Sequence, residues 1–198
     1  MKFIAFSTSV LLALCLPVLN CNAQTEAEVI KTVHDTLKDS PAGGLVKNKD
    51  AAILVFYRKS NKLLWLKNKD VDTYELITAK TIAPEETDDN KIGGPTPVGE
   101  YLIGQRYQNA THKIDWYRLY PRKEDNSGYY KYKEKTKKNR NEMGLHPGKV
   151  SLGCATVFAA KKPYDKEATW APVRDHVDAG KLRYNKDDFS GYLIVVDK

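Results

Sequence analysis

The chain has 198 residues and a formal net charge of +7, with 32 lysines and arginines against 25 aspartates and glutamates. This length is sufficient for one domain with a hydrophobic core, and the sequence shows no internal repeat, which excludes a repeat architecture. The basic charge has two interpretations. It favours binding to an anionic partner, such as a cell envelope or an acidic peptide, or it serves only to keep the protein soluble.

The first 23 residues have the features of a signal peptide. Lys2 gives a positive start, residues 3–19 are almost wholly apolar, and Ala23 ends a small-x-small cleavage site. The apolar stretch is short for a membrane span and contains Pro17 near its end. We therefore expect cleavage after Ala23 and no stable membrane insertion of the mature chain. The protein would then be secreted or periplasmic, which disfavours a nucleic-acid partner.

After the leader, the pattern predicts one helix and then mainly strands. Val29, Val33 and Leu37 recur at helical spacing, so residues 24–44 are expected to form an N-terminal helix and a linker, with the helix at 26–37. The main domain then comprises residues 45–198. Strands are predicted at 51–57, 63–66, 74–79, 100–103, 115–120, 155–158 and 191–196, and a second helix at 168–179. Many strands with few helices indicate a mainly β domain.

A charged segment interrupts this pattern. Residues 122–142 carry many charges and several tyrosines without a core pattern, so they are predicted to form a long loop. The loop is interpreted either as a lid that handles an anionic peptide or as a solvated segment. Trp116, Tyr117 and Arg118, in the strand before it, form either a wall of a site or part of ordinary strand packing.

A single cysteine remains once the leader is removed. The chain has three cysteines, and the first two leave with the signal peptide, so Cys154 has no disulfide partner within the mature chain. His146 lies eight positions upstream, and an imidazole can take the proton of a thiol to produce the nucleophilic thiolate. Gly153 allows the backbone to approach a substrate closely. We therefore favour an enzyme, with Cys154 as nucleophile and His146 as base, over a buried inert thiol and an ordinary turn histidine.

Two motifs resemble the L,D-transpeptidase family with a YkuD-type catalytic domain. The resemblance spans residues 51–196. The family's His…Ser-x-Gly-Cys signature is similar to His146-Pro147-Gly148 followed by Ser151-Leu152-Gly153-Cys154, and its Thr-Pro-x-Gly-x-Phe-x-Ile segment is similar to Thr96-Pro97-Val98-Gly99-Glu100-Tyr101-Leu102-Ile103. The chain departs from the family in a short gap between histidine and cysteine, in Leu152 where many members have histidine, and in Thr156 where arginine is common. It therefore looks more like a divergent branch.

The resemblance implies a β-sandwich with a few short helices that acts on peptidoglycan stem peptides. Cys154 would attack a carbonyl at an L-to-D linkage and form a thioester. His146 would act as base, with its tautomer fixed by the main-chain carbonyl of Pro147 or Gly148. The main-chain N–H groups of Gly153 and Cys154 are candidate donors to the oxyanion. The candidate oxyanion and substrate-binding residues are Gly148, Ser151, Leu152 and Gly153. This chemistry needs no cofactor and no metal.

Three alternatives remain open. An amine acceptor would give transpeptidation, whereas water would make the same site an L,D-carboxypeptidase. A cysteine peptidase that acts on proteins also has histidine before cysteine, although it leaves the Thr-Pro-Val-Gly segment unexplained. The third alternative, from another class, is a noncatalytic module that binds the cell envelope through its basic loop.

Overall fold

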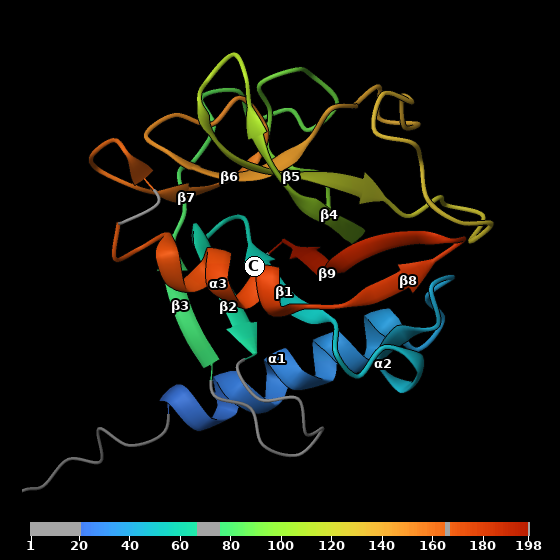
Figure 1. Ribbon diagram of the computed structural model, residues 1–198. Helices are drawn as coiled ribbons and strands as arrows, with labels where there is room; N and C mark the ends of the chain where they lie inside the picture. Colours follow the sequence, from blue (N-terminus) through green and yellow to red (C-terminus); the bar gives the residue numbers. More distant parts are fainter. Residues whose placement is uncertain (1–20, 67–75, 165–166, 198) are drawn as a thin grey trace, which may run out of the picture.

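A single bent β-sheet forms the centre of the structure (Figure 1). The computed structural model describes residues 21–66, 76–164 and 167–197. Its strands are β1 (Ala52–Tyr57), β2 (Lys62–Leu66), β3 (Leu76–Lys80), β4 (Gly99–Asn109), β5 (Ile114–Pro121), β6 (Gly144–Gly148), β7 (Ala155–Phe158), β8 (Leu182–Tyr184) and β9 (Asp187–Val196). The order in the sheet is β3-β2-β1-β9-β4-β5-β6-β7, and β8 pairs with β9.

The two ends of this strand order meet. Thr81, directly after β3, forms an isolated antiparallel bridge with Val157 of β7. The N–H of Ile82 donates to the carbonyl of Thr156 at 3.0 Å. The sheet is therefore nearly closed, and the mainly β, sandwich-like fold predicted from the sequence is confirmed.

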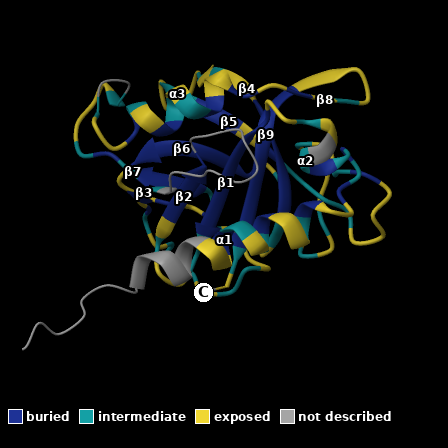
Figure 2. Ribbon diagram, turned by 90° about the horizontal axis from the view of Figure 1, so that it is seen from below, coloured by how far each residue is buried: buried dark blue, intermediate teal, exposed yellow. Residues whose placement is uncertain are grey.

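The central strands are buried on both faces. In β1, Leu54 and Phe56 belong to one hydrophobic cluster, whereas Ile53 and Val55 belong to a second cluster on the opposite face. Successive side chains of a strand point to opposite faces, so both sets are covered. Figure 2 shows these dark-blue strands between the helices. Burial on both sides explains why the sequence of β1 is a continuous apolar run rather than an alternating one.

Within the described residues, three helices pack on the sheet, namely α1 (Cys21–Leu37), α2 (Gly44–Lys47) and α3 (Ala171–Ala179). Val29, Val33 and Leu37 of α1 pack into the cluster that contains Ile53. Val173 and Val177 of α3 pack into the cluster that contains Leu54. The helices α1 and α3 therefore each bury an apolar stripe against the sheet.

The N-terminal segment is part of the folded domain. The predicted helix at 26–37 is present, and it begins earlier, at Cys21. In the predicted linker, Ser40 is buried and its hydroxyl donates to the buried carboxylate of Glu100 at 2.6 Å. Arg122 donates to the other carboxylate oxygen of Glu100 and to the carbonyl of Asp39. Residues 24–44 therefore contact the main sheet, and the domain boundaries remain a prediction. The predicted signal peptide lies outside the described residues, except for residues 21–23 in α1.

All seven predicted strands are present, with residues 74 and 75 of the third outside the described residues, and the differences in extent have local causes. β4 and β5 extend beyond the predicted 100–103 and 115–120. Their outer parts form a polar hairpin, and the sequence pattern missed them because polar and apolar residues do not alternate strongly there. β6 was not predicted, since its sequence, Gly144-Leu145-His146-Pro147-Gly148, is typical of a turn. It becomes a strand because β5 and β7 pair with it on its two sides. Within the described residues, no helix is long and apolar enough to cross a membrane.

Candidate active site

The strands β6 and β7 place the predicted nucleophile and base in one cavity. They are adjacent and parallel, with His146 opposite Thr156, and Cys154 directly precedes β7. His146 and Cys154 both line a cavity of about 270 Å3. The sequence motif shows only that these two residues are close along the chain, whereas the structure places both of them in one cavity.

Residues from three segments of the chain, 112–116, 147–152 and 162–164, complete the cavity. The remaining lining residues are His112, Ile114, Trp116, Pro147, Gly148, Lys149, Val150, Leu152, Lys162 and Tyr164. Gly148 and Leu152 were predicted to bind substrate, and both lie here. The side chain of Leu152 is at the rim, since the residue is 73% exposed. In the described part of the chain, no three His, Cys, Asp or Glu side chains are grouped as metal ligands.

The hydrogen bonds of His146 define its tautomer. Nδ1 lies 3.0 Å from the carbonyl oxygen of Pro147, one of the two carbonyls expected from the resemblance. A carbonyl only accepts, so Nδ1 carries the proton and Nε2 is the basic nitrogen. Nε2 lies 3.3 Å from the hydroxyl of Thr156, which can donate to it. The imidazole thus has the protonation pattern that a base requires.

An aromatic stack holds the imidazole ring. The indole of Trp116 lies parallel to it, with ring centroids 4.3 Å apart and an interplanar angle of 11°. His112 stacks on the same indole, with centroids 6.3 Å apart. Trp116 is therefore a wall of the site, whereas its neighbour Tyr117 is fully buried and donates to Asp178 at 2.7 Å.

Burial keeps both reactive groups neutral in the resting site. Desolvation raises the pKa of the Cys154 thiol to about 11. A hydrogen bond from the main chain of Gly144 and the positive charge of Arg140 both act in the opposite direction, but they are the weaker effects. The pKa of His146 is lowered to about 4, chiefly by desolvation and also by the nearby His112, although the hydrogen bond to the Pro147 carbonyl raises it. At pH 7 the site therefore holds a thiol and a neutral imidazole rather than a preformed ion pair.

A family model for the L,D-transpeptidase catalytic domain, YkuD, matches residues 50–174. This range covers more than half of the chain and includes the Thr-Pro segment, His146 and Cys154. The chain belongs to the L,D-transpeptidase catalytic domain family. The chain therefore contains a catalytic domain of the L,D-transpeptidase type.

Other comparisons are more distant. A search of curated proteins finds no match to this L,D-transpeptidase domain. Among solved structures, it is similar to a fused Zn-dependent amidase/peptidase/peptidoglycan-binding domain-containing protein from Clostridium acetobutylicum, at 9% identity and a TM-score of 0.42. The similarity covers 89% of this chain and 63% of that chain, so this chain spans less than two thirds of that protein.

Two further predicted residues of the L,D-transpeptidase site lie behind the cavity. Ser151 is buried, and its hydroxyl donates to the carbonyl of Cys154 at 2.8 Å. Gly153 is also buried and has a φ of +94°, and a Cβ at this position would lie 2.1 Å from the guanidinium of Arg140. These two residues shape the loop that presents Cys154, and neither lines the cavity.

Several residues that contact the site had no function predicted from the sequence. Thr156 pairs with His146, and both Thr96 and Arg140 donate to the carbonyl of Gly153. Thr96 was visible as part of the Thr-Pro segment, but its partner lies 57 residues away in sequence. Arg140 lies in a segment so rich in charge that it resembles a solvated surface.

The loop 122–142 does not cover the cavity. It contains turns and an isolated bridge between Arg122 and Tyr129 but none of the named strands, as predicted. Within the described residues, none of its side chains lines the cavity that holds Cys154, although the charge of Tyr132 interacts with that of Cys154. It is not simply solvated either, because Arg140 at its end is buried under the Cys154 loop.

Gly144 is expected to be essential for the shape of this site. A Cβ at Gly144 would lie 2.3 Å from the indole of Trp116. We expect Gly144→Ala to displace Trp116 from His146 and to lower the free energy of unfolding by about 2 kcal/mol, as overpacking does in other cores. Urea denaturation measures this change. Gly148→Ala, in the same strand, is the control: its Cβ would meet Thr156 at an ordinary 3.4 Å. Equal stability of the two variants would contradict the prediction.

Proposed function

We propose that this protein is an exported cysteine acyltransferase that acts on peptidoglycan stem peptides through a thioester on Cys154. The observation that carries the proposal is the shared cavity of Cys154 and His146, in which the imidazole has Nδ1 protonated and Nε2 as its basic nitrogen. The membership in the L,D-transpeptidase family supports the reaction type. The apolar residues 3–19 and the cleavage site support export.

The proposed reaction has two stages. As Sγ of Cys154 attacks the substrate carbonyl, the thiol proton passes to Nε2 of His146, and an oxyanion forms on the carbonyl oxygen. Collapse of this intermediate breaks the amide bond, and the leaving amine of the terminal D-residue takes the proton from His146. An amine acceptor then attacks the thioester and restores the thiol, with the new peptide bond as product. Water in place of the amine would give carboxypeptidase activity.

The neutral resting site is compatible with this order of events. Because the Cys154 thiol has a raised pKa and His146 has a lowered one, charge separation before substrate binding is unfavourable. In the proposed mechanism the proton therefore moves together with the attack on the carbonyl. The oxyanion, rather than a stored thiolate, then carries the negative charge, and main-chain donors can stabilise it.

The charges at the cavity rim support an anionic peptide substrate. Lys149 and Lys162 both line the cavity, and both are exposed to solvent. An ammonium group binds carboxylates as a compact charge, and stem peptides carry a terminal carboxylate. Trp116 and Tyr164 give the cavity an apolar wall against which the peptide can pack.

The proposal is tested by the mass of the intact protein after incubation with a peptidoglycan tetrapeptide. We expect an adduct that equals the tetrapeptide minus its terminal D-residue, and its loss when the protein is first blocked with iodoacetamide. Addition of an amine acceptor then distinguishes the two outcomes of the thioester, because a new peptide indicates transpeptidation and a free tripeptide indicates hydrolysis. Neither adduct nor product from folded, reduced protein would contradict the proposal.

A further inference from the structure

The carbonyl of Gly153, next to the predicted nucleophile, is held by two buried side chains. Arg140 donates to it from Nη2 at 3.0 Å, and the hydroxyl of Thr96 donates to it at 3.2 Å. Arg140 is 3% exposed and Thr96 is 1% exposed. Two donors satisfy both lone pairs of this carbonyl oxygen, so its direction is fixed.

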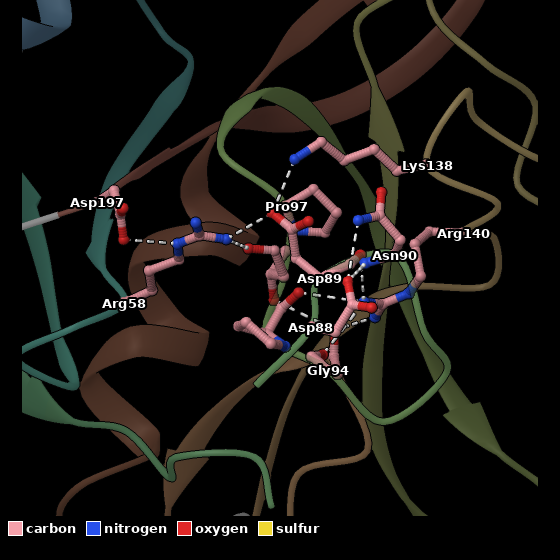
Figure 3. A network of polar contacts seen from close by, with 12 residues as sticks. Arg58, Asp88, Asp89, Asn90, Gly94, Pro97, Lys138, Arg140 and Asp197 are labelled. Atoms are coloured by element: carbon pink, nitrogen blue, oxygen red, sulfur yellow. Dashed lines mark hydrogen bonds and ion pairs between the residues drawn. The ribbon is translucent and has the colours of Figure 1, made fainter. Parts of the chain in front are cut away.

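Arg140 is itself anchored by the segment before Thr96. Its Nη1 donates to the carbonyls of Asp89, Gly94 and Pro95, at 3.1, 3.2 and 3.1 Å (Figure 3). The carboxylate of Asp89 in turn binds Arg58 at 2.9 Å and Lys138 at 2.7 Å. The guanidinium thus ties the segment 89–95 to the Cys154 loop through main-chain oxygens alone, and an outer set of ion pairs holds that segment in place.

The direction of the Gly153 carbonyl determines the direction of the Cys154 amide. Both belong to one planar peptide unit, and the Gly153–Cys154 bond is trans. In a trans peptide the C=O and the N–H point in opposite directions, so donors on the oxygen orient the N–H toward the other side. Hydrogen bonds to the oxygen also polarise the peptide and make the N–H a stronger donor. Gly153 permits this arrangement, because a Cβ there would overlap Arg140 and the carbonyl of Gly94.

We propose that Arg140 and Thr96 are positioning residues that orient and polarise the Cys154 N–H as a donor to the oxyanion. This inference rests on the proposed acyl transfer, since only a carbonyl substrate forms an oxyanion. It also gives the Thr-Pro segment a physical role. Thr96 carries a hydroxyl to the peptide unit of Cys154, so two motifs far apart in the sequence act on one amide.

Thr96→Val is the sharpest test, because valine has nearly the same shape and removes only the hydroxyl. Two probes of the same thiol are compared. Acylation by p-nitrophenyl acetate passes through an oxyanion and releases p-nitrophenolate, whereas alkylation by iodoacetamide displaces iodide without one. We expect Thr96→Val to slow acylation about 10-fold, less than the loss of a whole oxyanion donor, and to leave alkylation unchanged. Thr96→Ser, which keeps the hydroxyl, should restore acylation to within about 2-fold of wild type.

Two more variants complete the experiment. Thr169→Val removes a bond of the same kind at an exposed position, from the Thr169 hydroxyl to the carbonyl of Phe158 at 2.6 Å. Thr169 does not line the cavity, so this variant should change neither rate. Arg140→Lys keeps the positive charge but loses the planar fork, so acylation should fall relative to alkylation in this variant too. Circular dichroism confirms that each variant is folded.

Several results would overturn the inference. These are an unchanged acylation rate in Thr96→Val, an equal loss of both rates in that variant, or a wild-type protein that is alkylated but not acylated by the ester. Failure of the proposed function gives a different result, in which the ester acylates Cys154 with the expected dependence on Thr96 while the tetrapeptide is neither bound nor cleaved.

Discussion

Replacement of Cys154 by alanine is expected to reduce cleavage of a stem tetrapeptide at least about 10⁴-fold, as the loss of a nucleophile does in other acyl-transfer enzymes. Without Sγ no thioester can form, and the remaining donors act only on uncatalysed attack by water. The variant should remain folded, because alanine removes only a single sulfur atom from the cavity wall. Release of the terminal D-residue, measured by mass spectrometry, reports the loss.

Cys154→Ser is the matched comparison for this prediction. Serine keeps the size of the side chain and a polar hydrogen, but its hydroxyl ionises far less readily than a thiol, so we expect no covalent adduct and turnover close to that of Cys154→Ala. Full turnover in either variant would show that the reaction does not pass through this residue. The folded state of both variants is checked by thermal unfolding against the wild type.

Replacement of His146 by glutamine is expected to slow the same cleavage about 10³-fold, within the range for loss of a general base. Glutamine places a planar polar group next to Trp116. Its amide, unlike imidazole, is not basic enough to accept the thiol proton and become a cation. Single-turnover measurement of adduct formation separates this step from product release. A rate within a few-fold of wild type would exclude His146 as the base.

The pH dependence of the wild-type enzyme tests the same residue. The pKa of His146 is lowered to about 4, so the imidazole stays neutral, and able to accept a proton, down to about pH 5. Adduct formation should therefore persist at pH 5 and be lost as the pH falls through about 4. An acid limb near the ordinary histidine pKa of about 6.5 would contradict this.

Thiol alkylation supplies the complementary control. Since burial raises the pKa of Cys154 from 9.0 to about 11, iodoacetamide should react with it at pH 7 about 100-fold more slowly than with an unperturbed cysteine. Rapid alkylation at pH 5 to 6 would reveal a preformed thiolate–imidazolium pair and would contradict the neutral resting site.

The main strands could be predicted from the sequence because their side chains meet the core directly. The apolar runs of β1 and β9 reflect contacts with both hydrophobic clusters. β6 could not be predicted in the same way. Its histidine, proline and glycines favour a turn, and only the pairing with β5 and β7 makes this segment extended.

The candidate site shows the same division. Cys154 and His146 could be proposed from the chemistry of a thiol beside an imidazole, and Gly153 from its freedom of conformation. The contacts that hold them could not be predicted, because Trp116, Thr96 and Arg140 reach the site from other parts of the fold. Arg140 is the clearest case, since a single buried guanidinium has no signature within a segment of many exposed charges.

The near closure of the sheet restricts how a substrate can reach Cys154. Edge strands often bind peptides by adding them as a further strand, and β7 is the last strand in the order of the sheet. Its outer main chain is already occupied, by the bridge between Thr81 and Val157 and by the bond from Ile82 to Thr156. A stem peptide therefore cannot extend the sheet along these residues of β7. The proposed peptide substrate would reach Cys154 through the cavity rather than by strand addition at this edge.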